Sequence, residues 1–482
     1  MTGPGTGRTD TEPTAVPTAA EASAAVVIWL LVGSAFVMIL NETIMSVALP
    51  VLIVDLDISV GTAQWLTSGF LLMMAVVIPI TGFLLQRFPP RRVYLASMSL
   101  FSTGTLICAL APGFPVLMAG RIVQAAGTAV MVPLLMTSVI RLVPVERRGA
   151  TMGTMTVVIA VAPAIGPTLS GVILTLLGWR WMFWIVLPIA LLALAAGARW
   201  LRVRAEVRAV PLDLASVLLS ALAFGGLVFG LSSVGEAALG EALVPPWLPT
   251  AVGAVAMVIF VARQLRLQRT GRALLDLRPL AHRPFVISVV LVVLSMMSLF
   301  GALILLPLYL QDVLHVNAFV TGLAVLPGGL VMGLLGPVIG RRYDKIGARP
   351  LVIPGAAVLA GVLWAFTTLS ASSPLWTVIA MHVVLVIGLS LMLTPLVTDA
   401  LGQLPKDLDS HGSAIVSTLQ QVAGAAGTAL FITVMTLASS SAAGGTDVVG
   451  ARAAFLCAAL IATATLPVTF LVGRRGPKAE TA

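Results

Sequence analysis

Charged residues are scarce in this chain. Asp, Glu, Lys and Arg together make up 10% of its 482 residues, whereas soluble globular proteins usually carry about 25%. Hydrophobic residues make up 59%, and the mean hydropathy is +1.07. This composition excludes a soluble globular domain and indicates a polytopic membrane protein.

Cysteines are few, and nucleotide-binding motifs are missing. The two cysteines, Cys108 and Cys457, lie in apolar runs, a pattern that argues against a disulfide framework, a zinc site or a redox centre. The sequence has no G-x-x-x-x-G-K-[ST] motif and no loop long enough for a catalytic domain. We therefore expect no enzyme activity, no metal, no cofactor and no ATP-driven step, which leaves an ion gradient as the energy source.

Long apolar runs are what the sequence has in abundance, and they predict an all-α membrane protein. A transmembrane helix needs about 20 apolar residues. We predict fourteen spans, at residues 26–52, 60–85, 92–111, 115–143, 149–176, 180–200, 212–233, 246–266, 285–311, 318–340, 349–370, 374–400, 412–438 and 451–472. The expected parts are a disordered N-terminus (1–25), a six-helix half (26–200), an inserted helix pair with linkers (201–283), a second half (284–472) and a tail (473–482).

The basic residues predict the orientation. They gather in connections that follow even-numbered spans, such as 87–92, 147–148 and 341–349, whereas the opposite connections are mainly acidic, as at Asp55 and Asp312. By the positive-inside rule both termini are then cytoplasmic. The net charge of +9 is thus a topology signal, with contact to anionic membrane lipids as a second consequence, and we expect no nucleic-acid partner.

A carboxylate, Glu42, interrupts the first apolar run. A charge at the bilayer centre costs about 2.5–3.5 kcal/mol on insertion scales. Glu42 must therefore face a protein interior or a wet cavity, or hold a proton, so we interpret it as a proton-relay or cation-binding residue. The alternative is a structural carboxylate that pairs with a cationic side chain and ties two helices together.

Two loop segments repeat a common pattern. Gly82 to Arg92 follows the second span and Gly340 to Arg349 follows the tenth, and both read G-x-x-x-(Q/D)-(R/K)-x-(P/G). Such an internal repeat indicates two related halves with a substrate site between them, as in secondary transporters. The candidate gating residues of the two copies are Gly82, Arg87 and Arg91, and Gly340, Asp344 and Arg349.

These loops resemble the loop signature of the major facilitator superfamily, and further segments agree. Arg121 to Gly127 is similar to the superfamily motif R-x-x-Q-G-x-G, and Ala162 to Gly171 is similar to the antiporter motif G-P-x-x-G-G. Leu40 to Pro50 resembles the L-D-x-T-I-V-N-V-A-L-P signature of the fourteen-spanner drug:proton antiporters. Resemblance to the lincomycin-resistance type of exporter rests on Asn41-Glu42, Gln86-Arg87-Phe88 and His411-Gly412-Ser413-Ala414.

The resemblance implies a major facilitator fold of two six-helix halves plus two inserted helices. It implies proton-coupled export of lipophilic drugs or an antibiotic by alternating access, in a bacterial cytoplasmic membrane. The partners would be the drug, protons and membrane lipids, and we expect a monomer. The expected polar lining of the substrate cavity is Asn41, Gln64, Gln124, Tyr309, Gln311 and Gln420.

The antiporter motif assigns a second role to the fifth span. Its residues are Pro163, Gly166, Pro167 and Gly171. Bending and close packing there would seal the transporter against leak, and the alternative is a kinked packing helix without a transport role.

Two positions depart from the family pattern. The family's carboxylate stands where this chain has Asn41, so the acid has moved to Glu42, about 100° around the helix. The first loop has Gln86 where the signature has Asp. We call the cytoplasmic contact made by each loop repeat its latch. The first latch should therefore lack a carboxylate–arginine pair, whereas the second latch keeps Asp344 and Arg349.

The resemblance implies that the first and fourth spans line one cavity, and helix geometry allows Glu42 and Arg121 to be neighbours there. At 1.5 Å per residue, their depths in the membrane differ by about 6 Å, and Gln124 lies one turn from Arg121 on the same face. Positive charge favours the ionised acid and burial favours the neutral one, so this proton-coupling cluster could exchange a proton for a substrate. The alternative for Arg121 is a structural partner of backbone carbonyls.

Other polar and soft side chains are weaker candidates. We interpret Asp399 as interfacial, His382 as a hydrogen-bonded packing residue, and Asp213 as complementing the N-terminus of the seventh span. The 19 methionines would suit a broad cavity because their side chains adapt to varied apolar shapes, although most should face lipid or the core.

Three functions stay open on the sequence alone. These are drug export, export of a native metabolite or lipid, and a sensor or scaffold that does not transport. Glu42, Arg121 and the motif of the fifth span argue against the third.

Overall fold

The computed structural model describes residues 19–201, 213–238, 244–439 and 447–473. Within them the chain forms fourteen α-helices, one in each predicted span. They are α1 (Ala19–Asp55), α2 (Val60–Arg87), α3 (Pro90–Ala109), α4 (Phe114–Leu142), α5 (Arg148–Leu176), α6 (Arg180–Trp200), α7 (Leu214–Ala238), α8 (Trp247–Leu267), α9 (Arg283–Leu308), α10 (Ala318–Ile346), α11 (Arg349–Phe366), α12 (Leu375–Gly402), α13 (Asp409–Ala438) and α14 (Val448–Thr469).

Twelve of these helices are long and apolar enough to cross a membrane, within the residues described. The other two are α3 and α5. In α3 the polar residues Ser97, Ser102 and Thr105 are buried, so they face neighbouring helices and lower the average hydropathy without meeting lipid. A polytopic membrane protein is thus confirmed, whereas fourteen membrane crossings stay a prediction.

Local sequence explains where several helices begin and end. Ser59, Asn317 and Asp447 each precede a helix and accept a hydrogen bond from the backbone N–H three residues on, as helix-capping side chains do. Gly347 ends α10 with a φ of 79°, a conformation that favours glycine. These caps set the short connections that bring the two loop repeats next to other helices.

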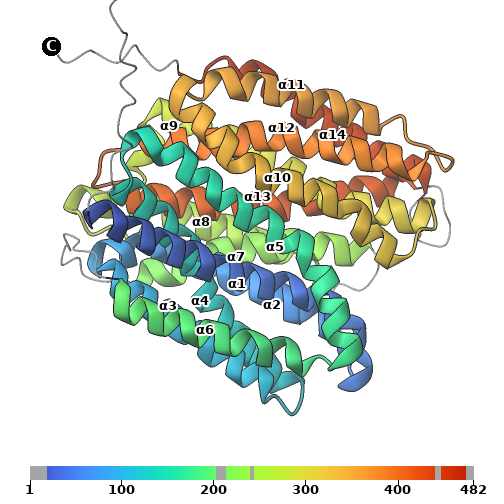
Figure 1. Cartoon of the computed structure of the whole chain (residues 1–482), viewed down its shortest axis with the longest axis horizontal. Helices are drawn as coiled ribbons and strands as arrows, with labels where there is room; N and C mark the ends of the chain where they lie inside the picture. The colour runs from blue at the N-terminus through green and yellow to red at the C-terminus, as the bar shows by residue number, and fades with distance from the viewer. Residues whose placement is uncertain (1–18, 202–212, 239–243, 440–446, 474–482) are drawn as a thin grey trace, which may run out of the picture.

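The helices α1–α6 and α9–α14 repeat the same neighbours. In the first set α3 packs on α4 and α6, α2 on α4, and α1 on α5; in the second set α11 packs on α12 and α14, α10 on α12, and α9 on α13. Figure 1 shows the first set on one side of the bundle and the orange-to-red helices of the second set on the other. This repetition is what two related six-helix halves produce.

Two seams join the halves, and they are also related by the repeat. One is α5 against α10, and the other is α2 against α13. The inserted helix α7 packs on both α2 and α13, and α8 packs on α7. The inserted pair therefore covers the α2–α13 seam.

An ion pair fixes the start of the inserted pair. Arg263 on α8 donates two hydrogen bonds to the Asp213 carboxylate, of 2.7 and 2.9 Å, and Ser216 donates a third of 2.6 Å. Asp213 directly precedes α7, as expected. The Arg263 guanidinium and the Ser216 hydroxyl lower the pKa of Asp213 to about 2, because they stabilise its ionised form.

Candidate functional site

A buried arginine, Arg121, joins three helices of the first half. Its side chain is fully buried on α4, and its Nη1 donates to Gln124 Oε1 at 2.8 Å and to Asn41 Oδ1 at 3.3 Å. Its Nε donates to the backbone oxygen of Leu66 at 3.4 Å, and its guanidinium lies 4.1 Å from the centre of the Phe70 ring. Arg121 thus has one predicted polar partner, Gln124, and one that was not predicted as its partner, Asn41. It also has one backbone partner, as in the structural alternative.

Gln124 extends this network to α3. Its Nε2 donates to Thr105 Oγ1 at 2.8 Å, and that hydroxyl donates to the Phe101 backbone oxygen at 2.7 Å. The chain of bonds orients the Gln124 amide so that its oxygen faces Arg121. Arg121 is therefore held in place by groups that do not titrate near neutral pH.

Glu42 lies beside this network without being part of its hydrogen bonds. Its side chain is partly buried, and its carboxylate and the Arg121 cation act on each other electrostatically. Within the described residues it forms no ion pair, and Arg121 Nη2 has no hydrogen-bond partner. The structure brings Asn41, Arg121 and Gln124 into direct contact, with Glu42 as an unpaired neighbour.

The antiporter motif of α5 packs against α1 at Thr43 and Ile44, which follow Glu42 in the chain. A Cβ added at Gly166 on α5 would lie 2.5 Å from Thr43 Oγ1 and 3.0 Å from Thr43 Cβ, so only glycine fits there without a shift. Ser170 Oγ donates to the Ile44 backbone oxygen at 3.0 Å. The motif therefore brings α5 against α1 at the residue next to Glu42.

The other motif positions are less constrained. A Cβ at Gly171 would meet nothing within 4 Å. Pro163 is partly buried on the continuous helix α5, and the Pro167 side chain lies outside the described residues.

The remaining predicted cavity residues have different surroundings. Tyr309, Gln311 and Gln420 belong to the second half, and Gln64 belongs to the first. Tyr309 is buried and its hydroxyl donates to the Ser370 backbone oxygen at 2.7 Å, a contact within that half. Gln311 is exposed on the π-helical turn η4 (Tyr309–Val313), and the Gln64 side chain lies outside the described residues. Of the three second-half residues, only Gln420 lines an internal cavity in the described part of the chain.

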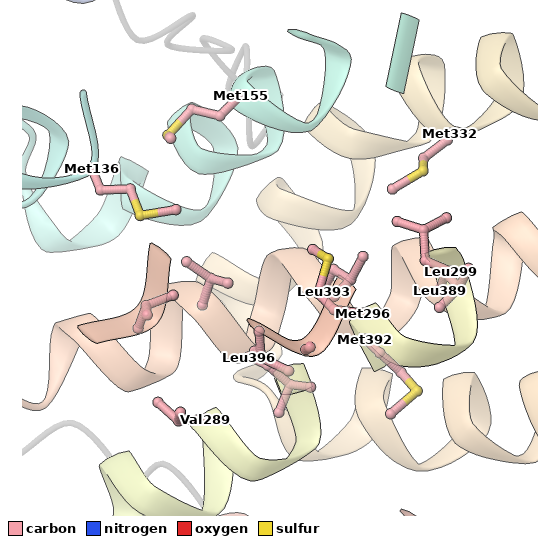
Figure 2. Close-up of a cluster of buried hydrophobic side chains, with 14 of the residues drawn as sticks. Met136, Met155, Val289, Met296, Leu299, Met332, Leu389, Met392, Leu393 and Leu396 are labelled. Carbon is pink, nitrogen blue, oxygen red and sulfur yellow. The ribbon is translucent and has the colours of Figure 1, made fainter. Parts of the chain in front are cut away.

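That cavity is lined by methionines and lies between the halves. Its volume is about 40 Å³. Figure 2 shows Met136 and Met155 on helices of the first half near Met296 and Met332 on α9 and α10 of the second. The full lining is Met136, Met152, Met155, Met296, Met332, Leu393, Thr394, Val397 and Gln420. A small hollow with long, adaptable side chains around it can widen when the halves separate.

The second loop repeat joins the halves at one end of the bundle. Asp344 at the end of α10 accepts hydrogen bonds from the backbone N–H groups of Gly149, at 2.7 Å, and Ala150, at 2.9 Å. These are unpaired donors of the first turn of α5, where a negative charge is also stabilised by the helix dipole. Gly149 and Gly340 allow this approach, because a Cβ on either would collide with the other's backbone oxygen.

The first loop repeat makes the equivalent contact with different chemistry. Gln86 Nε2 at the end of α2 donates to the backbone oxygen of Asp407, which precedes α13, at 3.0 Å. A Cβ added at Gly82 would lie 2.7 Å from His411 Nδ1. The first latch therefore joins the halves through an amide donor, where the second uses a carboxylate acceptor.

Two arginines of the first repeat, Arg91 and Arg87, have described contacts within their own half. Arg91 Nη2 donates to the Ala198 backbone oxygen at 2.6 Å. The Arg87 guanidinium lies 5.9 and 5.8 Å from the ring centres of Phe83 and Phe88. Arg349 is partly buried as the first residue of α11.

Sequence reasoning missed a charged contact in the same region. Asp409 at the start of α13 is buried, with Arg141 Nε of α4 3.9 Å from its carboxylate, and neither of its oxygens has a hydrogen-bond partner in the described part of the chain. His411 Nδ1 accepts a 3.3 Å hydrogen bond from the Asp276 backbone N–H. The motif His411 to Ala414 was the available signal, because it placed a histidine and polar residues at the start of a span.

These contacts show which end of the transporter is closed. We call the end that holds Arg87, Arg147, Arg263 and Arg341 the basic end. Both latches lie there, whereas polar contacts at the opposite end stay within one half, such as Trp179 Nε1 donating to Asp55 Oδ2 at 2.6 Å. The described helices therefore adopt an arrangement that is closed at the basic end.

Comparison with known proteins identifies the family of the chain. The model of the Major Facilitator Superfamily matches residues 31–428. The chain belongs to this superfamily. It is 43% identical over 400 residues to the lincomycin resistance protein LmrB of Listeria monocytogenes, covering 83% of this chain and 84% of that protein. It is 29% identical over 401 residues to the multidrug resistance protein B homolog of Mycobacterium tuberculosis, covering 82% and 73% respectively.

A solved structure confirms the fold. The human organic anion transporter MFSD10 superposes with a TM-score of 0.66 at 16% identity, covering 92% of this chain and 99% of that one. At this identity the likeness shows the fold alone. The all-helical major facilitator fold and the expected absence of an enzyme function are both supported, since the family and these relatives are transporters and resistance proteins.

Two further titratable residues of this major facilitator protein, Asp399 and His382, contact neighbouring helices. Asp399 Oδ2 accepts hydrogen bonds from Ser288 Oγ, at 2.9 Å, and Gln403 Nε2, at 2.7 Å. His382 is buried on α12, where its ring lies against Gly328 of α10. The buried position of His382 fits the expected packing role, although its Nδ1 has no hydrogen-bond partner among the described residues. The interfacial role of Asp399 stays a prediction.

Proposed function

We propose that this protein exports lipophilic drugs or an antibiotic across a bacterial cytoplasmic membrane in exchange for protons. The single observation that carries the proposal is Glu42, a partly buried and unpaired carboxylate beside the buried cation of Arg121. The names of the resistance relatives support the substrate class.

The proposal includes an orientation. The basic end faces the cytoplasm, both termini are cytoplasmic, and α3 and α5 cross the membrane with the other twelve helices. The positive-inside rule supports this, because the arginines of both loop repeats lie at that end. The described arrangement is then a state that is closed at its cytoplasmic end.

Proton exchange follows from the geometry around Arg121. A protonated Glu42 is neutral and needs no cation, which fits its lack of an ion pair. When Glu42 loses the proton, its negative carboxylate is attracted toward Nη2 of Arg121, which has no hydrogen-bond partner in the described residues. That movement would shift α1 against α4 and α5, which is how the protonation state could bias the two states of the transporter.

Substrate loading is assigned to the methionine cavity. In the described state it holds about 40 Å³, which is far below the roughly 300–1,000 Å³ of a drug-sized site. It lies between the halves, so opening the basic end would widen it toward the cytoplasm. Thioether side chains and the Gln420 amide would then accommodate apolar substrates of varied shape.

Transport in everted membrane vesicles tests the proposal. Uptake of a compound panel is measured with a proton gradient, and again after an uncoupler collapses the gradient. Gradient-dependent uptake of lipophilic drugs is expected. Uptake that persists without the gradient would remove proton coupling, and uptake of a metabolite or lipid but no drug would favour the alternative substrate class.

A further inference from the structure

A large cleft opens at the basic end on the side away from the inserted helix pair. Its volume is about 1270 Å³, and it lies between the first turns of α1, the end of α4, the 3-10 turn η1 (Val145–Arg147), the start of α5 and the end of α10. It is separate from Arg121 and from the methionine cavity. Because α10 belongs to the second half and the other elements to the first, the cleft spans the α5–α10 seam.

Four exposed cations line the cleft: Arg147, Arg341, Arg342 and Lys345. Within the described residues none of them forms an ion pair, in contrast to Arg141, Arg263 and Arg278 at the same end. The acids in the cleft are Glu146 and Asp344, and Asp344 binds the backbone of α5. The cleft therefore presents an excess of unpaired positive charge.

Apolar side chains of α1 and α10 also line the cleft, and exposed apolar residues of α10 continue from it onto the outer surface of the bundle. Ile28, Trp29 and Val338 line the cleft, with 64% of Trp29 and 44% of Val338 exposed. One turn further along α10, Leu334 is 74% exposed. An exposed tryptophan near the end of a membrane helix is typical of the membrane–water interface.

We propose that this cleft binds an anionic phospholipid, such as phosphatidylglycerol, and that the bound lipid favours the state closed at the basic end. The phosphate would lie among the four cations, and an acyl chain would follow Trp29, Val338 and Leu334 toward the bilayer. Basic pockets between membrane helices on the cytoplasmic side recognise anionic headgroups in this way. The proposal rests on the cytoplasmic placement of the basic end.

The preference for one state follows from where the cations come from. Arg147 belongs to the first half, whereas Arg341, Arg342 and Lys345 belong to the second. They lie on both sides of the latch between Asp344 and α5. A headgroup held by both sides binds less well once the halves part there, so by linkage it stabilises the closed latch.

Lipid binding can be measured on the purified full-length protein. Phosphatidylglycerol is titrated onto the protein in detergent and followed by native mass spectrometry, with zwitterionic phosphatidylcholine as the comparison lipid. Saturable binding that prefers phosphatidylglycerol is expected. Removing one cation should weaken it about fivefold, from the roughly 1 kcal/mol that a basic side chain contributes near an anionic surface.

The variants are Arg147→Gln and the double change Arg341→Gln with Arg342→Gln. Arg266→Gln is the matched control, because Arg266 is exposed and basic on α8, outside the cleft. Thermal unfolding of each variant shows whether it is folded. Equal affinity for the two lipids, or an equal loss in the control, would overturn the proposal.

Two other occupants are outcomes of the same experiment. Displacement of the lipid by millimolar inorganic phosphate would show a soluble-anion site and overturn the lipid assignment. Binding that appears only after Asp10→Asn with Glu12→Gln would show that the N-terminal segment fills the cleft, which also overturns it. Transport by the wild type in vesicles is scored separately, so a failed lipid site and a failed export function are distinguishable.

Discussion

At the scale of single residues, this transporter separates the group that could carry a proton from the groups that hold its partner cation. Arg121 is fixed by Asn41, Gln124 and the Leu66 backbone, none of which titrates near neutral pH. Glu42 stands beside them without a hydrogen bond to the cation. A change of protonation at Glu42 can therefore alter its attraction to Arg121 without dismantling the network.

We predict that Glu42→Gln abolishes drug-driven proton movement while the protein remains folded in the membrane. Glutamine keeps the size of the side chain but cannot exchange a proton, and no ion pair in the described residues is lost by the change. The measurement is drug-induced alkalinisation of acidified everted vesicles, at matched protein levels. A Glu42→Gln protein with the wild-type proton signal would refute the assignment.

We predict that Asn41→Ala weakens the site for a different reason. It removes one acceptor from the buried Arg121 Nη1, and a buried donor left without a partner costs about 1–3 kcal/mol. Thermal unfolding in detergent should show lower stability, whereas Thr62→Ala, at an exposed helix start, should cost less. Equal stability losses in the two variants would argue against a strained arginine network.

The position of Asn41 also shows where sequence reasoning reached its limit. Depth along the helices correctly placed the first span beside Arg121 and Gln124. It could not decide which of two adjacent residues faces α4, because that depends on the rotation of α1 in the bundle. The cluster at Asp409 was missed because burial of a loop-proximal carboxylate depends on contacts between the halves.

At the scale of helices, the two loop repeats make equivalent contacts of unequal strength. Asp344 binds two backbone N–H groups at the start of α5 as a charged acceptor, whereas Gln86 donates one neutral hydrogen bond. Hydrogen bonds to charged groups contribute about 1.5–3 kcal/mol, and neutral ones about 0.5–1.5 kcal/mol. The sequence predicted an asymmetry of another kind, a pair of Asp344 with Arg349 in the second loop alone, which stays a prediction. It did not foresee the contact of Asp344 with α5.

We predict that Asp344→Asn slows transport more than Gln86→Ala. The loss of about 1.5 kcal/mol from one latch changes the balance of two states by about tenfold, and only the first variant removes a charge-assisted contact. Initial rates of gradient-driven uptake in vesicles give the comparison, at matched expression. The asymmetry is wrong should both variants retain the same rate.

We predict a weak pH dependence at the junction of α7 and α8. Because Arg263 lowers the pKa of Asp213 to about 2, below the usual value of about 3.9, the pair stabilises the folded state above pH 4. That contribution is lost as the pH falls from about 4 to about 2. Asp213→Asn should lower the unfolding temperature slightly at pH 7, since such pairs contribute about 0.2–1 kcal/mol.

The control for this prediction is to measure the difference in unfolding temperature between wild type and Asp213→Asn over a range of pH. Wild type and Asp213→Asn should converge in unfolding temperature as the pH falls from about 4 toward 2, because Asp213 takes up its proton first in the unfolded state and near pH 2 in the folded state as well. A difference that stays constant from pH 7 to pH 2 would show that Asp213 acts by packing and not by charge.

At the scale of the whole molecule, the described state is closed at one end, and the inserted helices cover one of the two seams between the halves. Both latches and the Arg141–Asp409 contact lie at the basic end, and α7 covers only the α2–α13 seam. The number and type of helices followed from apolar runs in the sequence. The covering of one seam did not, because hydropathy says nothing about where an inserted pair docks.

The orientation of the bundle is the prediction on which the proposed mechanism depends most. The basic end should face the cytoplasm, which makes the described state one that is closed on the cytoplasmic side and places the Glu42 side of the pathway toward the acidic exterior. Single cysteines at Ser372, exposed between α11 and α12, and at Arg269, exposed after α8, report the two ends. They are introduced in a background without Cys108 and Cys457 and labelled on intact cells with an impermeant thiol reagent. We expect Ser372→Cys to react and Arg269→Cys to react only after the membrane is permeabilised.

The reverse pattern would invert the topology, and reaction of both on intact cells would break the fourteen-span count. Either result would also remove the mechanism, because proton-driven export requires Glu42 to load its proton from the outside.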